Sequence, residues 1–173
     1  MSKTIDFSKL NLQDALDVAI LIEDEAKERY EEFAAQMEAH HTTDAAQFYR
    51  FMAQNAAKHG RDLSDRRKKL FGANPSRMDR SMLWEVEAPG YEQAHAFMSP
   101  RAALDVAMEA EKKAYEFFVG IMKYVSDPAV KALFEELRHE EIEHQALVQR
   151  EIDKLPPDTG LDAEDYVDEP VAQ

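Results

Sequence analysis

Apolar residues recur at helical spacing through most of this chain, and the strict alternation of a surface strand is hard to find. The first helical segment runs from about 11 to about 37 or 39, and the second from about 44 to about 70. The third runs from about 100 to about 124, and the fourth from about 128 to just before Pro156. Because such stripes are typical of amphipathic helices, the pattern predicts an all-α protein with four long helices.

The predicted helices carry recognisable start and stop signals. Ser99 precedes Pro100, and Asp127 precedes Pro128. In each case a side chain that can cap a helix stands before a proline, which is favoured at the first helical position. Gly72 follows the second helix and is expected to end it.

The connections differ in length, and this predicts the topology. Short links join the first helix to the second and the third to the fourth, so each pair is expected to form an antiparallel hairpin. The segment 71–98 is much longer and contains Pro75, Pro89 and Gly90, so we expect it to be a crossover along a four-helix bundle. Residues 1–154 would form this bundle, and the acidic tail 155–173 is expected to be disordered.

Composition narrows the function classes. The formal net charge of -14 argues against a general binder of nucleic acids or anionic membranes, because phosphate groups would be repelled. The chain has no Cys, which excludes disulfides, zinc–thiolate sites and iron–sulfur clusters held by this chain. Residues 1–11 do not resemble a signal peptide, and no apolar run reaches the roughly 18 residues of a membrane span. A cytoplasmic location is therefore the expectation.

An internal repeat relates the two hairpins. The run Ala-Leu-Asp-Val-Ala at 15–19 recurs unchanged at 103–107, and in the same register Glu23 corresponds to Glu111. The second helices of the two hairpins also correspond, and this aligns His59 with His144. Packing two such hairpins about a pseudo-twofold axis would place equivalent residues face to face in the core.

The repeat directs attention to five side chains with metal-binding chemistry. Glu23 and Glu111 lie on apolar helix stripes, where a carboxylate is costly unless something pairs with it. Glu141 and His144 are three residues apart and share a helix face, and His59 takes the equivalent place on the second helix. Carboxylate and imidazole ligands suit iron, manganese or zinc, and this arrangement of ligands on four helices is known from di-iron bundles.

Two of these helices resemble those of a known family. The run Glu-Asp-Glu-Ala-Lys-Glu-Arg-Tyr at 23–30, with Phe33 and Ala34, resembles the first metal-binding helix of the rubrerythrin family. The segments 134–137 and 141–144 resemble its Glu-x-x-His helix. The resemblance covers about 12–154 and implies a ferritin-like four-helix bundle.

The resemblance also implies a function and a set of ligands. Rubrerythrins are di-iron proteins that reduce hydrogen peroxide, so we expect a redox protein that reduces peroxide or dioxygen in oxidative-stress defence. Glu23 and His59 would hold one ion, Glu111 and His144 the other, and Glu141 would bridge them. Tyr30 would either donate a hydrogen bond to a ligating carboxylate or serve as a core residue. Ferritin-like bundles often dimerise, so a homodimer is expected on resemblance alone.

This sequence departs from the family pattern in two ways. The family has a bridging Glu three residues before the histidine of the second helix, whereas this chain has Ala56 there. That leaves a dinuclear site with one bridge, a single well-held ion, or an empty site, with Asn55 as a further residue that could approach. Full-length rubrerythrins also carry a rubredoxin domain with four Cys, so here a separate electron-donor protein would be needed.

Two other readings remain open at this stage. The wider ferritin-like group includes ferroxidases, oxygenases and iron stores, and an iron-handling oligomer would be recognised by its native mass. Alternatively, the bundle is a scaffold with a degenerate metal site, for which Ala56 is the best support.

Overall fold

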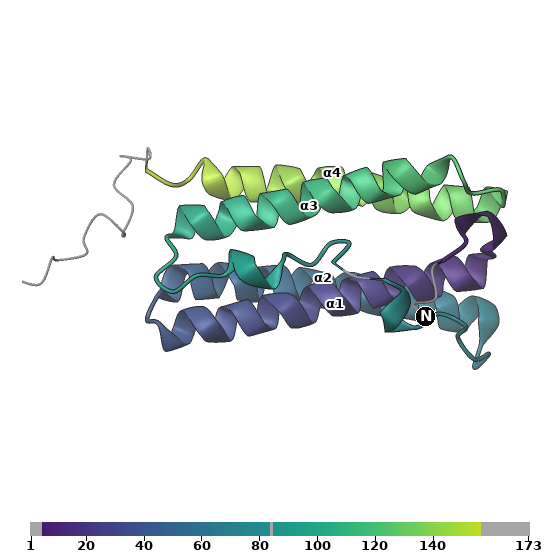
Figure 1. Cartoon of the computed structure of the whole chain (residues 1–173), viewed down its shortest axis with the longest axis horizontal. Helices are drawn as coiled ribbons and strands as arrows, with labels where there is room; N and C mark the ends of the chain where they lie inside the picture. Colours follow the sequence, from purple (N-terminus) through teal and green to yellow (C-terminus); the bar gives the residue numbers. More distant parts are fainter. Residues whose placement is uncertain (1–4, 84, 157–173) are drawn as a thin grey trace, which may run out of the picture.

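Four long helices form the body of the protein (Figure 1). The computed structural model describes residues 5–83 and 85–156. The helices are α1 (Leu12–Ala39), α2 (Thr43–Phe71), α3 (Pro100–Met122) and α4 (Pro128–Ile152). Three short 3-10 turns, Phe7–Lys9, Arg80–Met82 and Tyr91–Gln93, complete the regular structure, and no strand occurs among the described residues. The predicted all-α fold is confirmed.

The helix boundaries follow the local chemistry of the chain. The side chain of Ser99 accepts a hydrogen bond from the Ala102 amide at 3.1 Å, and that of Asp127 accepts one from the Ala129 amide at 2.7 Å. These bonds satisfy amides that have no partner inside the helix, so both predicted capping residues begin their helices. The third helix ends at Met122, slightly before the predicted position.

The helices pack as two hairpins. α1 packs against α2 and α3 against α4, and the two pairs meet through α2 on α3 and α1 on α4. The crossover returns along the bundle from the end of α2 to the start of α3 (Figure 1). Most of the predicted tail, 157–173, lies outside the described residues. None of the helices in the described ranges is long and apolar enough to cross a membrane.

The hydrophobic core is divided into two clusters along the bundle axis. One cluster uses α1 from Ala26 onward, and the other uses α1 up to Ile22. On α3 the same division falls between Ala107 and Phe118. Glu23 on α1 and Glu111 on α3 therefore lie at the junction of the two clusters. This polar layer in the middle of the bundle is where the repeat predicted converging ligands.

Candidate metal centre

The three predicted carboxylates are buried in this polar layer. Glu23 is 5%, Glu111 0% and Glu141 3% exposed. His144 links two of them, because its Nδ1 lies 3.1 Å from Glu111 Oε2 and 3.6 Å from Glu141 Oε2. α3 and α4 thus bring their predicted ligands into direct contact.

His59 connects the first hairpin to the second. Its Nδ1 lies 3.6 Å from Glu23 Oε1, which is too long for a good hydrogen bond. Its ring stacks on that of His144, with centroids 4.7 Å apart and planes 5° apart. The structure therefore brings all five residues that the sequence singled out into one cluster, with every helix contributing.

Several polar atoms of this cluster have no hydrogen-bond partner. Within the part of the chain that the structure describes, the buried atoms Glu23 Oε2, His59 Nδ1, Glu111 Oε1 and Glu141 Oε2 are all unpartnered. Burying polar atoms in this way is costly, and native proteins rarely leave them unsatisfied. Cations held by these oxygen and nitrogen atoms would satisfy them, so the donor set fits a metal centre.

Burial and mutual contact change the acidity of these groups. Burial raises the pKa of Glu23 and raises that of Glu141 to about 8, although the nearby imidazoles oppose both shifts. Burial lowers the pKa of His144, but the hydrogen bond with Glu111 and the nearby carboxylate of Glu141 outweigh this effect and raise the pKa to about 11. The cluster therefore holds protons near neutral pH, and metal binding would have to displace them.

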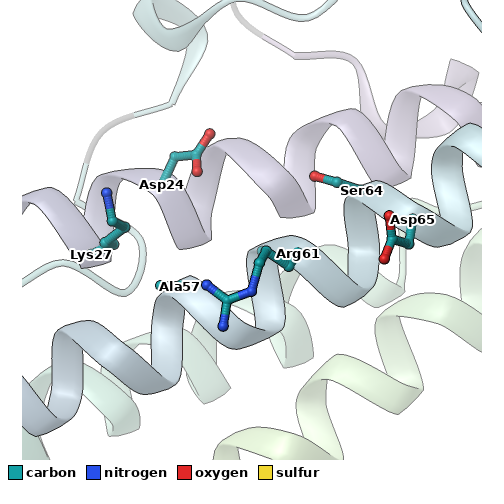
Figure 2. A pocket seen from close by; sticks show the side chains of 7 residues that line it. Asp24, Lys27, Ala57, Arg61, Ser64 and Asp65 are labelled. Carbon is teal, nitrogen blue, oxygen red and sulfur yellow. The ribbon is translucent and has the colours of Figure 1, made fainter.

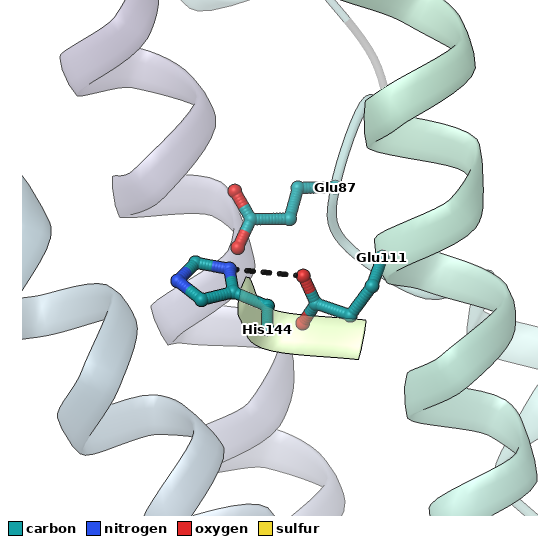
Figure 3. A group of neighbouring side chains, drawn as sticks. All are labelled: Glu87, Glu111 and His144. Carbon is teal, nitrogen blue, oxygen red and sulfur yellow. Dashed lines mark hydrogen bonds and ion pairs between the residues drawn. The ribbon is translucent and has the colours of Figure 1, made fainter. Parts of the chain in front are cut away.

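A sixth side chain, Glu87, enters the cluster from the crossover. Figure 3 shows its carboxylate directed toward Glu111 and His144. One ligand atom from each of these three residues lies within 4.8 Å of the other two. Glu87 is 4% exposed, and burial raises its pKa well above the ordinary value.

The sequence analysis did not identify Glu87. The residue belongs to neither hairpin of the internal repeat, and no helical periodicity marks it. Its neighbour two residues earlier, Glu85, is also acidic, so composition does not distinguish the two positions. Only the path of the crossover in the folded protein distinguishes Glu87, which enters the cluster, from Glu85.

Ala56 lies beside Glu87. Both line a small cavity of about 10 Å³, together with Asn55, Glu111 and His144. Ala56 is buried and shares this cavity with the cluster, so the position where the family has a Glu lies next to the cluster. The cavity has room for about one water-sized sphere, which means that the space next to Ala56 is already largely filled.

Tyr30 lies close to the carboxylates. Its hydroxyl is buried and has no hydrogen-bond partner among the described residues, so the bond to a carboxylate, one of its two expected roles, is not formed in this arrangement. Burial raises its pKa well above the ordinary value, and the nearby Glu111 and Glu87 raise it further. Tyr30 is thus an unused O–H donor beside the cluster.

A second concave feature lies outside the cluster. It is an open groove of about 380 Å³ between α1 and α2, shown in Figure 2. Residues of opposite charge line it, including Asp24 and Lys27 on α1 and Arg61 and Asp65 on α2. Because nothing in the groove converges as the core ligands do, we assign it no chemistry.

Comparison with known proteins identifies the family of this chain. The sequence pattern of the rubrerythrin family matches residues 14–152. The chain is also similar to the crystal structure of an uncharacterised conserved protein from Magnetospirillum magnetotacticum, with 32% identity and a TM-score of 0.63. That match covers 87% of this chain and 99% of the other. No match was found among curated proteins. The chain therefore belongs to the rubrerythrin family.

Proposed function

We propose that this protein is a dinuclear iron redox protein that reduces hydrogen peroxide or dioxygen. Membership of the rubrerythrin family supports a di-iron carboxylate protein in general. The observation that carries the proposal is the set of unpartnered carboxylate and imidazole atoms buried at the junction of the two core clusters. A purely structural core would gain stability by losing these groups, so their presence favours a bound cation.

The ligand assignment follows the two hairpins. Glu23 and His59, the pair at 3.6 Å, would hold one ion, and Glu111 and His144, the pair at 3.1 Å, would hold the other. Glu141 lies 3.6 Å from His144 and would bridge the two ions. Bound iron would supply the Lewis acidity and the electrons for the reduction, and manganese or zinc would also suit these ligands.

The protein's own groups prepare the centre for this chemistry. The Nδ1 atom of His144 lies 3.1 Å from Glu111 Oε2, so the two atoms that would hold the same ion already point toward each other. Glu141, with a pKa of about 8, holds a proton that the site would release when metal binds.

Electrons would come from a separate donor protein, because the chain has no Cys to hold an iron–sulfur cluster. We propose that the protein works in the cytoplasm, and that it forms a homodimer as the family resemblance implies. Native mass distinguishes this from an iron-storing shell, which would need many subunits.

The test is to load the protein with ferrous iron without oxygen and to measure iron per chain and the rate of oxidation after adding peroxide. We expect about two ions per chain and rapid oxidation by peroxide. Glu141→Gln should reduce both, whereas Glu143→Gln, on the exposed face of the same helix, should change neither. If the wild-type chain binds no iron, manganese or zinc, the proposed function is wrong.

A further inference from the structure

The crossover holds a buried carboxylate in the middle of the bundle. Glu87 is 4% exposed, whereas Glu92, further along the same segment, is exposed to solvent. Leaving a carboxylate in an apolar core is unfavourable unless it has a partner there. A carboxylate oxygen of Glu87 lies within 4.8 Å of one ligand atom of Glu111 and one of His144. The partners that would compensate its burial are therefore in the cluster and not in the crossover itself.

Two helices bind the backbone on either side of Glu87. On α1, the buried Arg29 donates to the Pro89 carbonyl and to the Glu85 side chain, and Glu25 Oε2 accepts a hydrogen bond from the Glu85 amide at 3.0 Å. On α3, Lys113 Nζ donates to the carbonyl of Ala88, the residue after Glu87, at 2.7 Å. The segment is therefore fixed from both sides of the crossover.

The local backbone is also strained. Glu85 has a φ of 50°, in the left-handed region that non-glycine residues rarely adopt. Strained residues persist where the surrounding structure holds them in place. Together with the bonds to Arg29 and Lys113, this indicates that the crossover is held in the one path that carries Glu87 into the core.

The position of Glu87 matches a gap in the ligand set. Ala56 stands where the family has a bridging Glu, and Ala56 and Glu87 line the same small cavity. Two divalent ions with Glu23, Glu111 and Glu141 would leave one positive charge uncompensated. A fourth carboxylate would remove that charge, and an unbalanced charge is costly in a buried site.

We propose that Glu87 is a metal ligand that takes the place of the carboxylate missing at Ala56, and that Arg29 and Lys113 are positioning residues for it. The proposal rests on the proposed function, since it requires that the centre binds metal. It replaces the reading in which Ala56 leaves a degenerate site, because the crossover supplies the carboxylate that α2 lacks.

Ferrous iron binding to the metal-free protein under anaerobic conditions tests the ligand. The wild-type chain should bind about two ions, and Glu87→Gln should bind about one, or bind the second at least about tenfold more weakly. Glu92→Gln, the same change at an exposed position of the crossover, should behave as the wild type. The melting temperature of metal-free Glu87→Gln should not fall, because the substitution removes a buried acidic group.

The exchange variant Ala56→Glu with Glu87→Ala tests the replacement. It moves the carboxylate from the crossover to α2, and binding of about two ions would support the proposal. Binding of only one ion by both Glu87→Gln and the exchange variant would overturn the replacement. Binding of two ions by Glu87→Gln with unchanged affinity would overturn the ligand assignment and leave the proposed function intact. Absence of metal from the wild type would instead remove the proposed function itself.

Substitutions of Lys113 test whether this residue positions Glu87. Lys113→Met should weaken binding of the second ion by about tenfold to a hundredfold, as is common for residues that orient a ligand. Lys113→Arg should restore most of it, because arginine can also donate to the Ala88 carbonyl. Lys112→Met, at the neighbouring exposed position, should have no effect. If Lys113→Met lowers the melting temperature but leaves iron affinity unchanged, Lys113 has only a structural role.

Discussion

The imidazole rings of His59 and His144 stack face to face, with centroids 4.7 Å apart and planes 5° apart. The two residues occupy equivalent positions in the two hairpins, so the stack joins the two halves of the repeat. A metal ion needs a neutral imidazole, whereas contacts with Glu111 and Glu141 raise the pKa of His144 to about 11 and so favour its protonated form. Proton release and metal binding are therefore coupled at His144.

The stability of the metal-free protein should fall as pH rises from about 5 to about 9. A group whose pKa is raised on folding stabilises the fold below its ordinary pKa, and this stabilisation is lost as pH rises through the folded value. For Glu141 the window runs from the ordinary 4.5 to about 8, and for His144 from 6.5 to about 11. Thermal unfolding with a chelator present measures the trend.

The stabilisation that bound metal provides should increase as pH rises. Ligands must lose protons to bind metal, so the difference in melting temperature between loaded and metal-free protein should grow with pH. Repulsion within the net charge of -14 could also lower the melting temperature as pH rises, and Glu141→Gln is the control for this effect. In the metal-free variant the melting temperature should fall less steeply with pH than in the wild type, because the carboxyl group that titrates has been removed. A melting temperature of the metal-free wild type that rises over this range would contradict the pKa shifts.

Arg67→Met should destabilise the fold without affecting metal content. Arg67 Nε lies 2.8 Å from Asp17 Oδ1, and Asp17 is 7% exposed, so the substitution leaves a buried carboxylate without its partner. The melting temperature should fall by several degrees. Arg66→Met is the matched control, because its partner Glu136 is exposed and surface ion pairs contribute little. An equal effect of both substitutions would show that burial of Asp17 is unimportant.

Tyr30→Phe should separate the two roles open to this residue. Removing an unpartnered buried hydroxyl should leave the metal-free protein as stable or up to about 1 kcal/mol more stable. If the hydroxyl donates to a ligating carboxylate, iron affinity should fall by about tenfold. Tyr49→Phe is the control, since its hydroxyl contacts Met98 Sδ at 3.7 Å. Unchanged iron affinity in Tyr30→Phe would leave Tyr30 as a core residue.

Ala56→Glu alone should not improve metal binding. With Glu87 in place, the added side chain must enter a cavity of about 10 Å³, so overpacking and a further buried carboxylate should destabilise the metal-free protein by about 1–3 kcal/mol. Iron per chain should stay at the wild-type value. Differential scanning calorimetry and elemental analysis measure the two effects, and a gain in bound iron would show that position 56 has an unfilled ligand role.

The helices and five residues of the cluster could be predicted from the sequence because the patterns that mark them are local or periodic. Capping at Ser99 and Asp127 depends on residues within one turn, and the apolar stripes follow the 3.6-residue period of a helix. The repeat aligned Glu23 with Glu111 and His59 with His144, and two equivalent hairpins meet where their equivalent residues face each other. The observed cluster agrees with that expectation.

The position of Glu87 was decided by the tertiary structure alone. Glu85 and Glu87 are both acidic and only two residues apart, yet Glu85 pairs with Arg29 at the side of the bundle while Glu87 is buried beside His144. What separates them is the path of the crossover, which depends on donors from α1 and α3 that are distant in sequence. A segment without regular period has no local rule for which side chain points inward, so only the packed helices could determine it.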